Sequence, residues 1–267
     1  MKIQNHKQPL FIIAAGGLGS RMKTWSSFIP KEFLPLNHRP GIFYLLEELI
    51  RLQVQGRIVY VYNPYYEPFY KWVEELIVNK RIFEYNKLIK KIDSDIEFLL
   101  DKLPFSIEFI PEDGPYSDLS SIITCKEYIH NDNNYIIYAD NVYINESPLK
   151  DLMEVAESES CLVGKQIDKI EDSRLYGVVK MSKNSGAKTC DVLMLKEKPS
   201  HQELQTMMNE NNFIDFAFNQ SRFKLTQHFI DNINLKECMY NNEPKLSVAI
   251  DNYVKKYSMK AIITNIK

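Results

Sequence analysis

The sequence lacks three features that would each indicate a particular class of protein. Its four cysteines, at 125, 161, 190 and 238, are widely spaced and form no CxxC pair, so neither a zinc site nor a disulfide framework is indicated. No stretch approaches the roughly 20 consecutive apolar residues that a membrane span needs. The formal net charge of −2 gives no electrostatic case for nucleic acid or an anionic membrane as a partner. We therefore expect a cytoplasmic protein with reduced thiols, which binds any phosphate through a local site.

Alternating elements characterise the first half of the chain. The length of 267 residues suits one large α/β domain or one domain with a small appendage, and 45% hydrophobic residues are ample for a packed core. Apolar runs alternate with helical periodicity, which predicts a mostly parallel sheet with helices on both faces. We expect strands at 11–15, 57–62, 106–110 and 135–138, and helices at 42–53, 66–78, 80–100 and 117–129.

The second half of the chain is richer in strand patterns. We expect strands at 160–164, 177–183, 190–197 and 261–266, and helices at 219–233 and 246–256. No internal repeat or low-complexity segment is visible.

The most informative stretch is a glycine-rich turn near the N-terminus. The apolar run 10–15 passes into Gly16-Gly17-Leu18-Gly19-Ser20-Arg21, the pattern of a buried strand that breaks into a turn. A backbone without Cβ atoms can wrap a polyphosphate closely and point its N–H groups at the anion. Lys31 follows ten residues after Arg21, in a segment made rigid by a proline on each side. These two cations would supply the positive charge that a triphosphate and its leaving pyrophosphate require.

Neither of the two common glycine fingerprints fits this turn. A P-loop needs Gly-Lys-Ser/Thr, but Gly19 is followed by Ser20-Arg21. A dinucleotide fold needs a third glycine, which is missing after Gly17-Leu18-Gly19. On the glycines alone, an ordinary strand-to-helix turn with a solvated arginine is the better interpretation. The block from Pro30 to Pro35 shifts the balance towards a phosphate site.

Together, two motifs resemble the signature of the sugar-1-phosphate nucleotidyltransferases. They are Ala14-Ala15-Gly16-Gly17-Leu18-Gly19-Ser20-Arg21 and Pro30-Lys31-Glu32-Phe33-Leu34-Pro35-Leu36. The closest branch is that of the bacterial UTP–glucose-1-phosphate uridylyltransferases, which share the long helical segment expected at 66–100. The resemblance implies a Rossmann-like, mostly parallel sheet flanked by helices, with a smaller strand-rich sugar-binding part. It implies a single domain over 1–267, in which 1–145 binds the nucleotide and 146–267 binds the sugar phosphate.

The resemblance also assigns roles to the two motifs. The signature loop would hold the nucleoside triphosphate, while the two cations would act on its phosphates and on the sugar phosphate. The implied nucleotide-binding residues are Ala14, Ala15, Gly16, Gly17 and Gly19, and the implied catalytic residues are Arg21, Lys31 and, further along the chain, Lys198.

Asp140 is the candidate metal ligand. It ends the apolar strand expected at 135–138, and its carboxylate could hold Mg²⁺ against phosphates or could cap the next turn. Ligands of open α/β sheets bind at the carboxyl ends of strands, where both Asp140 and the glycine turn fall. In the resembling family, an acidic residue at this strand end binds the catalytic magnesium.

The segment 111–121 stands where the family has its base-recognition loop. There a Gln normally precedes a Gly-Leu-Gly-His-Ala run, whereas Glu112 and Asp113 stand near the Gln position here. We take Glu112, Gly114 and Ser120 as candidate nucleotide-binding residues, and the departure leaves the nucleobase open. On the residues alone, an acidic turn that caps a helix from Ser117 is an equally good interpretation.

Two later motifs resemble the sugar-binding part of the family. The run 173–179 resembles Arg-Tyr-Gly-Val, in which the backbone of the glycine, here Gly177, lies against the sugar. The run 195–199 resembles Val-Glu-Lys-Pro, so Glu197 would accept hydrogen bonds from sugar hydroxyls and Lys198 would contact the sugar phosphate. Asn141 is a further sugar-binding candidate. Without the resemblance, these runs would be an edge strand and a charged turn.

The family has a second metal-binding Asp in a Gln-Leu-Thr-Asp-Ala-Ile run. The matching run here is 245–250, and Val248 takes the place of the Asp. Asp251 lies three residues on, about one helical turn away, and could substitute.

The implied activity joins a nucleoside triphosphate, UTP by the closest branch, to a sugar 1-phosphate such as glucose 1-phosphate, with Mg²⁺ as cofactor. Two alternatives stay open. One is a non-catalytic nucleotide-sugar sensor, suggested by Val248 and the altered base loop, and the other is a transferase for another base or a non-sugar phosphate. Relatives commonly associate, so a homo-oligomer is also left open.

Overall fold

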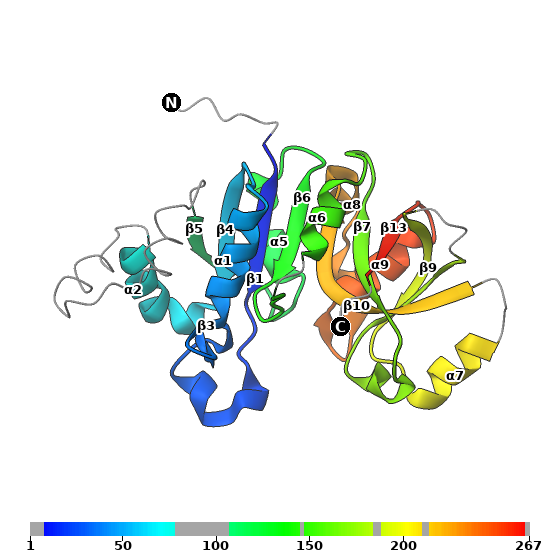
Figure 1. Ribbon diagram of the computed structural model, residues 1–267, viewed down its shortest axis with the longest axis horizontal. Coiled ribbons are helices and arrows are strands. Elements are labelled where there is room, and N and C mark those ends of the chain that lie inside the picture. Colours follow the sequence, from blue (N-terminus) through cyan, green and yellow to red (C-terminus); the bar gives the residue numbers. More distant parts are fainter. Residues whose placement is uncertain (1–7, 78–106, 145–146, 184–187, 210–213, 265–267) are drawn as a thin grey trace.

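The central feature of the fold is one nine-stranded sheet. A computed structural model describes residues 8–77, 107–144, 147–183, 188–209 and 214–264, and the helix expected at 80–100 lies outside them. The strand order is β5-β4-β1-β6-β10-β7-β13-β9-β8, so strands from both halves of the chain share the sheet (Figure 1). The strands are β1 (Leu10–Ala15), β4 (Arg57–Tyr62), β5 (Ile107–Pro111), β6 (Asn134–Tyr138), β7 (Cys161–Gln166), β8 (Val178–Ser182), β9 (Cys190–Lys196), β10 (Ile214–Leu225) and β13 (Lys260–Thr264). Two short ribbons, β2 (Pro35–Leu36) with β3 (Arg39–Pro40) and β11 (Met239–Tyr240) with β12 (Glu243–Pro244), stand apart from it.

The sheet is mixed rather than mostly parallel. Strands β5, β4, β1 and β6 run parallel to one another, as the sequence predicts. Strand β10 lies antiparallel to both β6 and β7, and β9 lies antiparallel to β13 and β8. The prediction of a mostly parallel sheet is therefore right for the N-terminal strands and wrong for the C-terminal half, where, among the strands that the structure describes, only β13 and β7 pair in parallel.

Helices cover both faces of the sheet, with α2 near one end and α7 near the other (Figure 1). They are α1 (Gly41–Arg51), α2 (Glu67–Ile77), α5 (Ser120–Thr124), α6 (Pro148–Met153), α7 (His201–Asn209), α8 (Gln227–Asp231) and α9 (Leu246–Val254). The sequence did not predict α6 or α7, and the helix expected at 117–129 contracts to α5 and one 3₁₀ turn. Among the described residues, no helix combines the length and apolar character that crossing a membrane would need.

The core has two layers because strand side chains alternate between the faces of the sheet. In β1, Leu10 and Ile12 pack on the side covered by α5, α8 and α9. Phe11 and Ile13 pack on the opposite side, beneath α1, α2 and α6. The first strand is thus buried on both faces, which fixes where the glycine turn leaves the sheet.

One predicted helix is wrong. Residues 219–233 form the second half of β10 followed by the short helix α8. The strand has a bulge between Asn219 and Phe223, which interrupts the period-two pattern. In the same part of the strand, Arg222 and Lys224 are completely buried, so polar and apolar residues do not separate solvent from core. Both effects hide the strand from sequence periodicity.

Candidate active site

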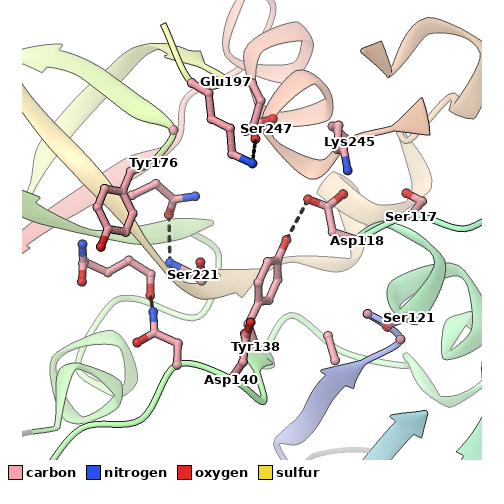
Figure 2. A pocket seen from close by; sticks show the side chains of 18 of the residues that line it. Ser117, Asp118, Ser121, Tyr138, Asp140, Tyr176, Glu197, Ser221, Lys245 and Ser247 are labelled. Atoms are coloured by element: carbon pink, nitrogen blue, oxygen red, sulfur yellow. Dashed lines mark hydrogen bonds and ion pairs between the residues drawn. The ribbon is translucent and has the colours of Figure 1, made fainter. Parts of the chain in front are cut away.

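The carboxyl ends of β1 and β6 open on a cavity of about 560 Å³. Its wall comes from both halves of the chain, and Figure 2 shows labelled residues from each around the central Tyr138. The cavity brings together ten of the predicted site residues, namely Ala14, Gly16, Gly17, Arg21, Lys31, Asp140, Asn141, Gly177, Glu197 and Lys198. Ala15, Gly19, Glu112, Gly114, Ser120 and Asp251 do not line it.

The glycine turn is held from behind by its carbonyl groups. The Asn63 amide donates to the Gly16 carbonyl at 2.8 Å, and the Tyr66 hydroxyl donates to the Leu18 carbonyl at 3.1 Å. On the other side, the Leu18 N–H donates weakly, at 3.4 Å, to the hydroxyl of Tyr116, which lines the cavity. Gly19 has φ +62°, a left-handed conformation that favours glycine. Gly16 and Gly17 line the cavity while these carbonyls are held on the other side, an arrangement that suits an anion site.

Lys31 and Asp140 meet across the cavity floor. The Lys31 Nζ lies 2.5 Å from Asp140 Oδ2, although the two residues are 109 positions apart. About a quarter of the lysine side chain and two fifths of the aspartate side chain remain exposed, at 24% and 40%. Because both side chains are partly exposed, their charges stay accessible to a ligand. A pair of this kind contributes little to the stability of the fold.

Glu32 fixes the segment that carries Lys31. This carboxylate is 3% exposed and accepts hydrogen bonds from Tyr60, at 3.1 Å, and from Tyr70. Burial raises the pKa of Glu32 because the charged form loses its solvation. Sequence reasoning gave Glu32 no role, since the tyrosines come from β4 and α2 and only the fold brings them near.

Asp140 is a suitable but solitary carboxylate for a metal on this side of the cavity. Within the described ranges, no group of three or more His, Cys, Asp or Glu could hold a metal ion. Mg²⁺ is commonly bound by one or two carboxylates together with substrate phosphates and water, so the donor set fits an ion that arrives with a triphosphate. Asp251 cannot add to it from its present position, because its carboxylate pairs with Lys255 at 2.7 Å and accepts from Leu195 N–H at 3.4 Å.

The expected base loop lines the cavity through Tyr116, Ser117, Asp118 and Ser121, while its three predicted site residues lie behind that wall. Glu112 is 9% exposed and accepts a hydrogen bond from Ser121 at 3.0 Å, and burial raises the pKa of Glu112. The Ser120 hydroxyl donates to the Pro115 carbonyl, and Gly114 has φ +124°. These three predicted residues shape the loop, while Ser121 faces the cavity.

Gly16 is the tightest point between the turn and this loop. A Cβ atom added there would lie 2.3 Å from Glu112 Oε1, and the carboxylate is held in place by burial and by Ser121. We expect Gly16→Ala to lower the free energy of unfolding by about 1–3 kcal/mol through overpacking. Urea unfolding measures this, and the added substitution Glu112→Ala should recover most of the loss.

Gly177→Ala is the matched control for that experiment. A Cβ atom at Gly177 would meet its nearest neighbour, Glu197, at 3.5 Å, which is ordinary van der Waals contact. Its free energy of unfolding should stay close to that of the wild type. Equal losses for the two alanine variants would contradict the steric explanation for Gly16.

The bulge of β10 supplies a wall that the sequence prediction missed. Asn219, Gln220 and Ser221 line the cavity beside Gly177, and the Asn219 N–H donates to the Gly177 carbonyl at 2.8 Å. Ser221 has φ +53° and Lys198 has φ +39°, so two non-glycine residues at the cavity adopt left-handed backbone. Such conformations persist where the surrounding structure imposes them, often at functional sites. The wrongly predicted helix concealed this part of the site.

A further unpredicted group lies between the two halves. Asp118 Oδ2 accepts from the Tyr138 hydroxyl at 3.1 Å, and Oδ1 accepts from the Leu246 N–H at 2.9 Å. Burial raises the pKa of Asp118. Lys245 and Ser247 also line the cavity (Figure 2), and sequence reasoning had considered their run only for the carboxylate missing at Val248.

The family profile described as "Nucleotidyl transferase" matches residues 10–258. The chain therefore belongs to the nucleotidyl transferase family and is an enzyme of that class. Nucleotidyltransferases of this family generally use a divalent metal ion.

Individual relatives are more distant. The chain is 27% identical over 247 residues to a UTP–glucose-1-phosphate uridylyltransferase of Staphylococcus epidermidis, covering 90% of this chain and 79% of that protein. It is 25% identical over 203 residues to a protein of the same name from Mycoplasma pneumoniae, covering 73% and 67%.

Solved structures show the same fold. A UDP-glucose pyrophosphorylase complexed with UDP-glucose matches with a TM-score of 0.72 at 19% identity, covering 97% of this chain and 92% of that one. A UTP-bound UGPase from Acinetobacter baumannii matches with a TM-score of 0.74 at 16% identity, covering 97% and 87%.

Proposed function

We propose that this chain is a UTP–glucose-1-phosphate uridylyltransferase, which forms UDP-glucose and pyrophosphate with Mg²⁺ as the metal. The observation that carries the proposal is the Lys31–Asp140 pair, at 2.5 Å, beside a glycine turn in the same cavity as Glu197 and Lys198. The names of the relatives support the same substrates.

In the proposed reaction, the two halves of the chain hold different substrates. Residues 1–145 hold the triphosphate, through the N–H groups of the glycine turn and through Arg21 and Lys31. Residues 146–267 hold the sugar phosphate, through Glu197 and Lys198. Cation side chains from both halves of the chain line the cavity and would offset the charge of two polyanions that must approach each other.

An oxygen of the acceptor phosphate attacks the α-phosphorus in line, and the bond from that phosphorus to the β-phosphate bridging oxygen breaks. The attacking oxygen is already an anion, so no general base is needed. Asp140 would hold the metal, which neutralises phosphate charge when bound. Positioning of the substrates and neutralisation of their charge by Arg21, Lys31 and Lys198 account for the remaining rate acceleration.

A pyrophosphate-release assay on the purified full chain tests the proposal. We expect the highest kcat/KM with UTP and glucose 1-phosphate. Four other nucleoside triphosphates test the nucleobase, because Glu112 stands near the expected base-reading position. Other sugar 1-phosphates, an alditol phosphate and an amino alcohol phosphate test the acceptor. Binding of UTP or UDP-glucose without pyrophosphate release from any pair would contradict the proposal and support a sensor.

A further inference from the structure

The N-terminus of α9 carries a buried hydroxyl with no partner. Ser247 is 5% exposed, it lines the cavity, and its Oγ has no hydrogen-bond partner in the part of the chain that the structure describes. Leaving a buried hydroxyl unsatisfied destabilises the folded protein, so a group of this kind at a cavity surface points to a ligand that completes it.

The backbone around Ser247 is also ready to donate. Helix α9 has nine residues, long enough for its N-terminal end to carry a positive partial charge. The Leu246 N–H is taken by Asp118, whereas the N–H groups of Ser247 and Val248 have no acceptor among the described residues. The first turn contains no acidic side chain. With Val248 in place of a carboxylate, the acidic groups near this turn come from other elements, namely Asp118, which accepts from Leu246, and Glu197, which acts on Lys245.

Lysine side chains add charge on the same wall. Lys245 immediately precedes the helix, and both it and Lys198 line the cavity. Figure 2 shows Lys245 and Ser247 on the side of the cavity opposite Asp140, with Tyr138 and Asp118 between. The Lys245 ammonium pairs with Glu243 at 2.8 Å, and its side chain, which lines the cavity, remains 22% exposed. The nearby Asp118 has both oxygens engaged, by Tyr138 and Leu246.

We propose that Ser247, Lys245 and the first turn of α9 form a binding site for a phosphate monoester, and that this is the phosphate of the acceptor. The second half of this statement rests on the proposed function. The triphosphate is assigned to the wall of the glycine turn, so the acceptor phosphate takes the wall across from it. A hydroxyl, two backbone N–H groups and a lysine are the donors typical of a phosphate site at a helix N-terminus. Ser247 and Lys245 therefore join Lys198 in holding the acceptor.

The variants Ser247→Ala and Lys245→Met test this site. We expect each to raise the KM for glucose 1-phosphate about tenfold or more, the effect of losing one charge-assisted donor, while the KM for UTP changes less than twofold. Lys236→Met is the matched control, because Lys236 is an exposed lysine outside the cavity. The unfolding temperatures of Lys245→Met and Lys236→Met should remain close to that of the wild type, and that of Ser247→Ala should be equal or higher, because the substitution removes the unsatisfied hydroxyl.

Calorimetric titration with inorganic phosphate and with glucose 1-phosphate separates this proposal from the proposed function. Both ligands should bind the wild type and the Lys236→Met variant, and both should bind Ser247→Ala and Lys245→Met at least tenfold more weakly. Unchanged affinity in these two variants, or a rise in the KM for UTP instead, overturns the site. If no substrate pair releases pyrophosphate but the variants still lose phosphate affinity, the proposed function fails and the phosphate site stands.

Discussion

Lys31→Ala should lower kcat by about two to three orders of magnitude while leaving the protein folded, in assays with UTP and glucose 1-phosphate. The Lys31 ammonium pairs with Asp140 in the cavity that the glycine turn also lines. There it can stabilise the negative charge that develops on the leaving pyrophosphate. A group that stabilises charge developing in the transition state affects kcat more than substrate binding.

The stability of the same variant should hardly change. The Lys31–Asp140 pair is partly exposed, and such pairs contribute about 0–1 kcal/mol. The anchor of the segment, the Glu32 carboxylate with its two tyrosine partners, is left intact. Urea unfolding alongside steady-state kinetics measures both quantities on one preparation.

Lys71→Ala is the matched control for Lys31→Ala. Lys71 pairs with Glu67 at 2.7 Å on the surface of α2, away from the cavity lining. Its removal should alter neither kcat nor the free energy of unfolding. Near-normal kcat in Lys31→Ala would contradict a catalytic role for the lysine. A large loss of kcat in Lys71→Ala would mean that the assay responds to a loss of folded protein and not to catalysis.

Local sequence was sufficient to predict those parts of the site whose position depends on the local course of the backbone. The glycine turn follows a doubly buried strand, Lys31 stands in a rigid proline-flanked segment, and Asp140 ends a short apolar strand. Parallel strands bring their carboxyl ends to one edge, so these residues meet without knowledge of the rest of the sheet. The parallel order of β5, β4, β1 and β6 follows from the same alternation of strands and helices.

The remaining wall could not be predicted because it depends on distant contacts. Asp118 caps the N-terminus of α9 across 128 positions of sequence, and no local pattern announces it. Strand β10 pairs antiparallel with its neighbours in the sheet. Its bulge and its buried charged residues interrupt the alternation of polar and apolar residues by which a strand is predicted from sequence. Ser247 is informative only because it is buried and unpartnered, a property of the packed structure.

A buried ion pair supports the Asp140 segment from behind. Arg222 and Glu48 are both fully buried, with the guanidinium nitrogen 3.3 Å from the carboxylate. Arg222 also donates to the carbonyl of Tyr138 at 3.2 Å and to that of Asn141 at 2.6 Å, one on either side of Asp140. Strand β10, which lies between β6 and β7 in the sheet, thus holds the backbone of the segment that carries Asp140, the candidate metal ligand.

Arg222→Met should therefore lower the free energy of unfolding by about 3–5 kcal/mol, since it leaves the Glu48 carboxylate buried without its charge partner. The double variant Arg222→Met/Glu48→Met removes both charges and should recover much of that loss, as apolar replacements of buried pairs often do. Urea unfolding of the single and double variants measures the difference.

Turnover should not recover with stability. In the double variant, the carbonyls of Tyr138 and Asn141 still lack the guanidinium donor, so the Asp140 segment loses two of its contacts, although the Asn141 N–H still donates to the Tyr138 carbonyl at 3.1 Å. We expect kcat to stay at least tenfold below the wild type at saturating substrate, because a small displacement of a reacting group is enough to cost this much. A stable double variant with wild-type kcat would show that Arg222 serves the fold alone, whereas a stable variant with low kcat would make the antiparallel strand β10 part of the catalytic apparatus.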